Sequence, residues 1–372
     1  MIPKTAIVHD WLVSLRGGEK VLQAIGELYP SPVYTLLKNK KVLQQLGLEN
    51  DLVHTSFIQH LPFASKGYRN YFPLFPTAIE RFDLSAYDLI LSSSHSVAKG
   101  VCKWPDQLHI CYCHSPMRYA WDLYDQYTQN LRGIKKIAAR AGLKYMRTWD
   151  FRVSKRVDYF IANSQFIRKR IQRVYGRDAE VIYPPVMTHL FESKQKEDFY
   201  LTVSHLVPYK KIDLIVEAFS FLPDKRLVVV GEGPEWKRVQ EKAGKNVELL
   251  GYQEDHVVRD LLARAKGFVF AAEEDFGIAP VEAQAAGSPV IAYGRGGVLE
   301  TVIEGKTGVF FQEQTIQSLI GAIERFEQME FDPLFIKTHA EQFGKERFCK
   351  SFQAFVEKKW EVFCEDSYSC RR

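Results

Sequence analysis

The sequence lacks the features that would place it outside the ordinary globular proteins. Its 372 residues contain no apolar run near the roughly 18 residues that a membrane-spanning helix needs, and no tandem repeat or low-complexity tract. Six cysteines form no Cys-x-x-Cys pair, which favours free thiols over a disulfide scaffold. No basic segment followed by an apolar one opens the sequence, so we expect no secretory signal and a cytoplasmic location.

Patterns of metal ligands are also scarce. Cys111 and Cys113 alternate along a predicted strand and precede His114, but no second group of ligands with zinc spacing accompanies them. We therefore expect buried thiols at this position and no bound metal.

The composition is that of a globular protein, with 46% hydrophobic and 26% charged residues, and the length favours two domains. The net charge of +5 is unevenly distributed. Between Arg132 and Arg177, 14 Lys and Arg stand against two Asp, so this segment carries +12 and the rest of the chain −7. Such a segment is either a solvated helical surface or a docking face for an anion.

Short, continuous apolar runs alternate with amphipathic helical segments along the chain. Runs of this kind, bounded by Gly, Pro or Ser, are typical of buried parallel strands, so we predict an α/β fold of doubly wound sheets. The predicted strands are Thr5–His9, Leu89–Ser92, Gln107–Cys113, Tyr159–Asn163, Phe199–Val203, Arg226–Val230, Val247–Leu249, Gly267–Ala271 and Pro289–Ala292.

Helical spacing of apolar residues predicts helices over Ile134–Arg156 and Asp213–Phe221, and one over the last 25 or so residues. A polar break after Pro184-Pro185 separates two α/β halves. We assign residues 1–190 and 191–345 to two domains, and 346–372 to a helix that returns toward the first. Two such domains place the carboxyl ends of both sheets around one cleft, where we expect a ligand. In the last helix, one face carries Phe352, Phe355, Val356, Trp360 and Phe363.

The most informative stretch runs from Glu273 to Ala292, directly after a predicted strand. We expect Phe276-Gly277 to form a turn and a helix to follow, with Glu282 in its first turn. Unpaired N–H groups at such a helix start bind anions, phosphate above all. Glu274 and Glu282 can both point to the same place and accept hydrogen bonds from hydroxyls. Glu282 alone would also fit an acid that complements the helix dipole.

Other junctions between a strand and a helix share this character. The Ser204–Lys211 segment places Lys210 where a phosphate would bind as a counter-ion. Gly231–Pro234 and Gly294–Val302 follow further strands, and Gly17-Gly18 opens a helix in the first half. Glycines at such points permit tight turns close to a ligand. Each feature taken alone also fits a solvated helix start.

In this order the motifs resemble those of the retaining nucleotide-sugar glycosyltransferases of family 4, whose GT-B fold has two Rossmann-like domains facing across a cleft. The resemblance covers essentially the whole chain. It is carried by GGEKV, HSP at His114–Pro116, NSQFI at Asn163–Ile167, SHLVPYKKIDLIVEAF, GEGP, the Glu-x7-Glu element and GGVLETV. Within the family, SSSHSVAKGV and LVPYKKIDLIVEAF look most like bacterial mannosyltransferases of O-antigen and other surface polysaccharides, such as lipopolysaccharide.

The resemblance implies roles for individual residues. Lys210 would neutralise the donor diphosphate, Glu274 would hold hydroxyls of the transferred hexose, and His114 would lie beside the sugar, so these three are the candidate catalytic residues. Glu282 would hold the ribose. The implied donor is a nucleotide sugar, most specifically GDP-mannose, bound as a substrate and not as a cofactor. The candidate donor-binding residues are Gly17, Gly18, Ser204, His205, Lys210, Gly231, Glu274, Phe276, Gly277, Ile278 and Glu282.

Two positions depart from the family pattern. Ser204-His205-Leu206 stands where such enzymes carry Gly-Arg-Leu, so the arginine that pairs with phosphate is replaced by His205. A histidine is only partly charged near neutrality and offers no bidentate fork. Lys211 stands where glycine is commoner.

On the acceptor side, the basic segment 132–177 and the aromatic and basic residues of 57–82 suit an acceptor at an anionic membrane, such as a glycan linked to polyprenyl diphosphate. We therefore expect a peripheral position on the inner face of the cytoplasmic membrane. Nucleic acid is a poorer explanation, because no nucleic-acid-binding motif accompanies the charge. The absence of Asp-x-Asp, the acid pair that holds a divalent ion in the other common glycosyltransferase fold, is a second reason to expect no metal.

Two other functions fit the same architecture. One is a nucleotide-sugar epimerase, which would need an acid/base pair at the sugar. The other is an inactive subunit that binds a glycan or a catalytic partner; the presence of Lys210, Glu274 and Glu282 argues against it, and the His205 substitution keeps it open.

Overall fold

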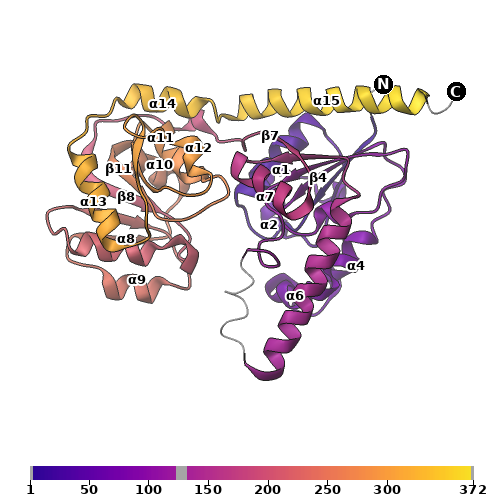
Figure 1. Ribbon diagram of the computed structural model, residues 1–372, viewed down its shortest axis with the longest axis horizontal. Coiled ribbons are helices and arrows are strands. Elements are labelled where there is room, and N and C mark those ends of the chain that lie inside the picture. Colours follow the sequence, from indigo (N-terminus) through magenta and orange to yellow (C-terminus); the bar gives the residue numbers. More distant parts are fainter. Residues whose placement is uncertain (1–2, 123–131, 370–372) are drawn as a thin grey trace. The chain divides into compact units, whose positions relative to one another are not determined.

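The computed structural model describes residues 3–122 and 132–369. It divides into two compact units, one of Met1–Tyr183 with Phe348–Arg372 and one of Pro184–Arg347 (Figure 1). Both are parallel α/β units of the predicted class. Among the described residues no helix is long and apolar enough to cross a membrane.

The first unit is built on a seven-stranded parallel sheet in the order β3-β2-β1-β4-β5-β6-β7. Its central strands β1, β4 and β5 are buried at every residue, as continuous apolar runs predict. The strands are β1 (Thr5–His9), β2 (Val33–Thr35), β3 (Val53–Thr55), β4 (Leu89–Ser94), β5 (Leu108–Cys113), β6 (Tyr159–Ala162) and β7 (Ala179–Val181).

Helices cover both faces of this sheet. On one face the apolar side of α1 packs with the C-terminal helix α15, and on the other α4 packs with α6. The predicted apolar face of the C-terminal helix is confirmed, because Phe352 and Val356 are buried in the core of the first unit. The helices are α1 (Gly17–Leu28), α2 (Lys40–Leu46), α3 (Ala64–Gly67), α4 (Phe75–Glu80), α6 (Gly133–Ser154), α7 (Gln165–Tyr175) and α15 (Lys345–Ser369).

The second unit has a six-stranded parallel sheet in the order β10-β9-β8-β11-β12-β13. Its strands are β8 (Glu197–Val203), β9 (Leu227–Val230), β10 (Val247–Gly251), β11 (Ala265–Phe270), β12 (Val290–Tyr293) and β13 (Gly308–Phe311). Its helices are α8 (Ile212–Ser220), α9 (Trp236–Lys242), α10 (Asp255–Arg264), α11 (Ile278–Ala285), α12 (Val298–Thr301), α13 (Ile316–Glu327) and α14 (Pro333–Glu341).

Each sheet has one topological switch point, a pair of adjacent strands from which the chain winds outward in opposite directions. In the first sheet the pair is β1 and β4, and in the second it is β8 and β11. Loops that leave the carboxyl ends of such a pair diverge, and ligands of open α/β sheets bind in the crevice between them. The topology therefore marks two places where the site residues should be sought.

In the basic segment 132–177, half of the positively charged side chains form contacts within the first unit. Seven arginines bond to carboxylates or carbonyls. The side chain of Lys135 is not among the described ones. These arginines are Arg147 with Ala120, Arg152 and Arg156 with Glu80, Arg168 with Asp178, Arg170 and Arg173 with Asp122, and Arg177 with Val157. The segment is thus partly a structural surface, and the remaining charge is concentrated on α6.

Candidate functional site

Two of the predicted residues meet at the switch point of the second sheet. Lys210 closes the short 3-10 helix η6 (Pro208–Lys210) after β8, and Glu274 lies in the loop after β11. Lys210 Nζ and Glu274 Oε1 form an ion pair, and the two side chains are 20% and 19% exposed. A cation and a carboxylate that still reach solvent can exchange this partner for a ligand, the lysine for a phosphate and the glutamate for a hydroxyl.

The backbone around Lys210 explains one departure of the sequence. Lys211 has φ +56° and ψ +33°, a left-handed conformation that glycine adopts without steric cost. A residue with a side chain is strained there, which accounts for glycine being the commoner residue. His205 is exposed in the same loop, and its carbonyl accepts a hydrogen bond from Val207 N at 2.9 Å.

The glycine-rich loops support this site through backbone packing. A Cβ on Gly231 would lie 1.8 Å from the carbonyl oxygen of Ser204, and one on Gly297 would lie 2.4 Å from Cα of Phe276. Gly231 has φ +132°, which also excludes most side chains. Because these residues are glycines, the neighbouring loops can pack closely against the two segments that carry Lys210 and Glu274. Direct contact of Gly231 and Ser204 with a donor stays a prediction.

The segment after Glu274 forms the predicted turn and helix, with one correction. Phe276 is 3% exposed and packs on Phe343 at 5.7 Å between ring centroids, so it anchors the turn. Gly277, with φ +89°, is the N-cap, and α11 starts at Ile278. Glu282 is then the fifth residue of the helix, in its second turn, and the expectation of a first-turn position is wrong. The helix starts earlier than expected because Gly277 can take the left-handed conformation.

The remaining predicted residues lie together at the carboxyl edge of the first sheet. His114 follows β5, and Gly17 and Gly18 open α1. A Cβ on Gly18 would lie 3.7 Å from His114 Nε2 and 3.8 Å from His9 Cε1, so the helix start covers both rings. Burial and the nearby charges of His95 and His9 lower the pKa of His114 to about 3, so its ring is neutral at neutral pH.

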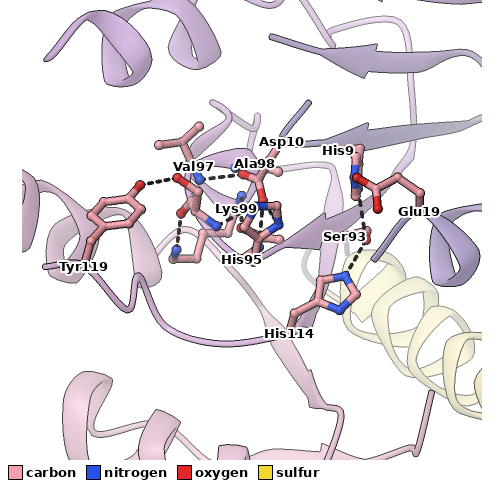
Figure 2. Close-up of polar contacts among 12 residues, drawn as sticks. His9, Asp10, Glu19, Ser93, His95, Val97, Ala98, Lys99, His114 and Tyr119 are labelled. Atoms are coloured by element: carbon pink, nitrogen blue, oxygen red, sulfur yellow. Dashed lines mark hydrogen bonds and ion pairs between the residues drawn. The ribbon is translucent and has the colours of Figure 1, made fainter. Parts of the chain in front are cut away.

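The switch point of the first sheet holds residues that the sequence analysis missed. Asp10, directly after β1, is 0% exposed and accepts four backbone N–H bonds from the turn after β4 (Figure 2). The donors are His95 at 2.7 Å and Ser96 at 3.0 Å to Oδ2, and Val97 at 2.6 Å and Ala98 at 2.7 Å to Oδ1. The carboxylate thus takes the place of a helix cap and fixes this turn.

Asp10 also pairs with the side chain of His95, Nδ1 to Oδ2 at 3.0 Å. Burial raises the pKa of Asp10, but the charge and hydrogen bond of His95 outweigh this and lower it well below its ordinary value. Burial lowers the pKa of His95, and the charge and hydrogen bond of Asp10 raise it by more. The pair is therefore ionised, with the imidazolium 34% exposed.

A second line of polar contacts joins Glu19, His9, Ser93 and His114. One sequence pattern could have indicated the missed residues: polar side chains at the carboxyl end of continuous apolar strands. It occurs in HDW at the end of β1 and in SSSHS at the end of β4. Such groups are buried only when they find partners, and the partners come from strands far apart in the sequence.

Cys111 and Cys113 are buried free thiols, as expected. Within residues 3–122 and 132–369, no group of three or more His, Cys, Asp or Glu side chains is arranged to hold a metal ion.

Comparisons with known proteins agree with this division of the chain. A family model described as "Glycosyltransferase Family 4" matches residues 33–190, and one described as "Glycosyl transferases group 1" matches residues 190–346. A crystal structure of Anabaena Alr3699/HepE in complex with UDP-glucose has a TM-score of 0.69 at 18% identity, over 95% of this chain and 99% of that one. This likeness confirms the predicted α/β fold of the GT-B type.

Similar curated proteins include two mannosyltransferases. GDP-mannose-dependent alpha-(1-6)-phosphatidylinositol monomannoside mannosyltransferase of Mycolicibacterium smegmatis is 28% identical over 214 residues, 49% of this chain and 56% of that protein. Alpha-1,3/1,6-mannosyltransferase ALG2 of Saccharomyces cerevisiae is 26% identical over 247 residues, 51% of this chain and 47% of that protein. The chain thus spans about half the length of these relatives.

Proposed function

The chain belongs to glycosyltransferase family 4, and on that premise we propose that it transfers a hexose from a nucleotide sugar, with retention, to an acceptor hydroxyl. The observation that carries the proposal is the Lys210–Glu274 pair at the switch point of the second sheet, because it combines a phosphate counter-ion with an acceptor for sugar hydroxyls. Breaking the bond to a nucleoside diphosphate leaves negative charge on the leaving group, which a positioned cation stabilises.

In this proposal most of the predicted donor residues have a role. Lys210 binds the diphosphate together with the N–H groups at the start of α11, where Gly277 is the N-cap and Ile278 the first helical residue. Glu274 accepts hydrogen bonds from the hexose and Glu282 from the ribose. His114, Gly17 and Gly18 of the first unit stay candidate donor contacts, as the resemblance of their motifs implies.

We propose GDP-mannose as the donor, which the two similar mannosyltransferases support. UDP-glucose is the main competitor, since it is bound in the similar Anabaena structure. A thermal-shift screen of GDP, UDP and ADP sugars decides between them. A true donor at about 100 times its dissociation constant stabilises the folded state by about 2.7 kcal/mol.

The screen carries its own control. Lys210→Ala should lose the shift produced by the donor, whereas Lys211→Gly, which removes the neighbouring lysine without strain, should keep it. A shift that survives in Lys210→Ala would contradict the assigned site. Absence of any shift with the three classes of nucleotide sugar would contradict the proposed function.

A pH series tests whether His205 takes the place of the arginine that pairs with phosphate. A histidine in place of arginine contributes positive charge only when protonated, so donor affinity should weaken as the pH rises. The donor dissociation constant of wild type and of His205→Arg, measured across pH, tests this, and the arginine variant should show the flatter profile. Identical profiles would mean that His205 takes no part in phosphate binding.

We further propose that the acceptor lies at an anionic membrane and that α6 makes the contact. Lys136, Arg140 and Lys144 recur every fourth residue along α6, and their side chains form no hydrogen bond or ion pair with any other described residue. Ile137 and Tyr145, one position further on, are 70% and 49% exposed. A helix with adjacent basic and apolar stripes fits an interface that offers both anionic headgroups and acyl chains.

Cosedimentation with phosphatidylglycerol-containing vesicles at low and high salt tests the contact. Replacement of Lys136, Arg140 and Lys144 by Ala should abolish binding at low salt. The matched control replaces Lys237, Lys245 and Lys306, three exposed lysines of the second unit, and changes the net charge equally. If both triple variants bind alike, α6 is not the contact. Such an interface would bring the chain to a polyprenyl-diphosphate-linked glycan, a substrate of surface polysaccharide synthesis.

A further inference from the structure

A line of four side chains connects α1 to the end of β5 (Figure 2). Glu19 Oε1 lies 3.8 Å from His9 Nε2, His9 Nδ1 lies 3.2 Å from Ser93 Oγ, and Ser93 Oγ lies 2.8 Å from His114 Nε2. His9 and Ser93 are 0% exposed and Glu19 is 4% exposed. Because solvent does not reach these groups, each depends on its neighbours in the line for hydrogen bonds.

Both ends of the line are fixed by the fold. At one end, Glu19 Oε2 accepts the backbone N–H of Arg16 at 2.8 Å in a capping box, which leaves Oε1 to face His9. At the other end, His114 is partly exposed, and its Nδ1 has no hydrogen bond to any residue of 3–122 or 132–369. His114 is thus the point where the buried line reaches the surface of the first unit.

The hydroxyl of Ser93 imposes a rule on this line. It carries one proton and contacts a ring nitrogen on each side, so it donates to one ring and accepts from the other. When His9 is neutral, its proton belongs on Nε2, opposite the carboxylate of Glu19, and the bare Nδ1 accepts from Ser93. Ser93 then accepts from Nε2–H of His114. A neutral His114 with its proton on Nε2 has a bare Nδ1.

Protonation of His9 reverses the line. Both nitrogens of the imidazolium donate, so Ser93 accepts from His9 and donates to His114 Nε2. The proton of a neutral His114 then sits on Nδ1, which becomes a donor. The titratable groups that face His9 are Glu19 of α1, Asp10 after β1, His95 after β4 and His114 after β5. Two of these four are carboxylates, and His95 is held as a cation by Asp10.

We propose that His9 and Ser93 are positioning residues that set the tautomer of His114, so that its outward Nδ1 accepts a hydrogen bond from a substrate hydroxyl while His9 is neutral and donates one when His9 is protonated. This inference deepens the proposed function, on which the identity of the substrate hydroxyl rests. The tautomer of His114 is set by contacts within the folded chain, so it can be measured without a substrate.

The test is ¹⁵N NMR of the full-length protein with ¹⁵N-labelled histidine, without ligand, because the nitrogen shift distinguishes a protonated from a bare ring nitrogen. The His9 and His114 signals are assigned by their loss in His9→Asn and His114→Asn, and one spectrum reports the proton positions of both rings. Where His9 is observed to be neutral, His114 should show a protonated Nε2 and a bare Nδ1, and where His9 is observed to be charged, the reverse. A spectrum in which a neutral His9 accompanies a protonated Nδ1 of His114 would overturn the proposal.

Ser93→Ala should release His114 to a mixture of both tautomers. Ser92→Ala is the matched control, since Ser92 makes an equally buried bond to another ring, His109 Nε2, at 2.8 Å from the same strand, and should leave the His114 signal unchanged. An unchanged His114 tautomer in folded Ser93→Ala would overturn the proposal. Should that variant not fold, the wild-type spectrum alone still decides.

An activity measurement separates this inference from the proposed function. With GDP-mannose or UDP-glucose as donor, Ser93→Ala should lower kcat roughly three- to tenfold with little change in KM, the loss expected of one hydrogen bond. Ser92→Ala should keep the wild-type kcat and KM. Wild-type protein that transfers no hexose would refute the proposed function, whereas the nitrogen shifts would still confirm or refute the line of contacts.

Discussion

At the carboxyl edge of the first sheet, the polar side chains are buried and already bonded to one another. Asp10, His9 and Ser93 are 0% exposed, and Asp10 alone accepts four backbone N–H bonds. At the equivalent edge of the second sheet, Lys210 and Glu274 keep about a fifth of their surface in solvent, and glycines bring the supporting loops together.

The difference shows how one topology can serve two purposes. A buried network whose members are bonded mainly to one another holds atoms in place and leaves few groups for a ligand. An ion pair that still reaches solvent can exchange one partner for another at small cost. We therefore expect substitutions in the first edge to act mainly on stability and substitutions in the second mainly on transfer.

The largest expected effect is on transfer. Lys210→Ala should lower kcat/KM roughly 10³-fold by removing the cation next to the leaving diphosphate, while the urea midpoint stays near that of wild type. Glu274→Gln should also lose activity, and the exposed neighbour Glu273 provides the control Glu273→Gln, which should not. Retained activity in Lys210→Ala would contradict the assignment of transfer to the edge of the second sheet.

Asp10→Asn should produce the largest loss of stability. Its NH2 group would face two of the backbone N–H donors, and His95 would lose its counter-ion, so the free energy of unfolding should fall by about 3 kcal/mol. Urea denaturation measures this, with Asp178→Asn, in an exposed ion pair with Arg168, as the control that should match wild type. If Asp10→Asn instead lost transfer at unchanged stability, the two edges would not differ as proposed.

A smaller effect concerns pH. Burial lowers the pKa of His109, on β5 of the first sheet, to about 4, from an ordinary value near 6.5. The unfolded chain therefore binds a proton that the folded chain refuses, and folding is weakened as the pH falls below 6.5. His109→Asn should remove about 2 kcal/mol of the stability change between pH 7 and pH 5. His256→Asn, at an exposed site of the second unit, should leave that change intact.

The smallest effect concerns the strained backbone beside Lys210. Lys211→Gly should raise the free energy of unfolding by at most about 1 kcal/mol, since relief of the left-handed conformation is partly offset by the entropy of glycine. Differential denaturation of the two proteins measures it. A clear loss of stability would show that the Lys211 side chain contributes more than its backbone costs.

Continuous apolar strands were the predictable part of the fold. Thr5–His9 is confirmed as β1, and the runs at Leu227–Val230 and Tyr159–Ala162 were found to within a residue. β2 and β3 were not predicted, because three residues such as Val33–Thr35 form a strand only through the neighbours with which they pair. β13 was missed for a related reason, as it takes its place through pairing with β12.

The site divides in the same way. Lys210, Glu274 and Gly277 could be predicted because each lies between a strand and the next helix and belongs to a local motif. Asp10 and His95 are 85 residues apart in the chain, and the sequence near either residue does not indicate that they pair. Only the sheet order, which places β4 beside β1, brings them together.

The C-terminal helix α15 links this architecture to synthesis of the chain. Phe348, Phe352 and Val356 are at most 2% exposed and belong to the core of the first unit, where the two phenylalanines pack on Tyr112 of β5. Domains commonly fold in order as they leave the ribosome. Here the first domain lacks part of its core until residues 348–356 have been translated, so the second domain, whose residues end at 347, is the first that can fold to completion.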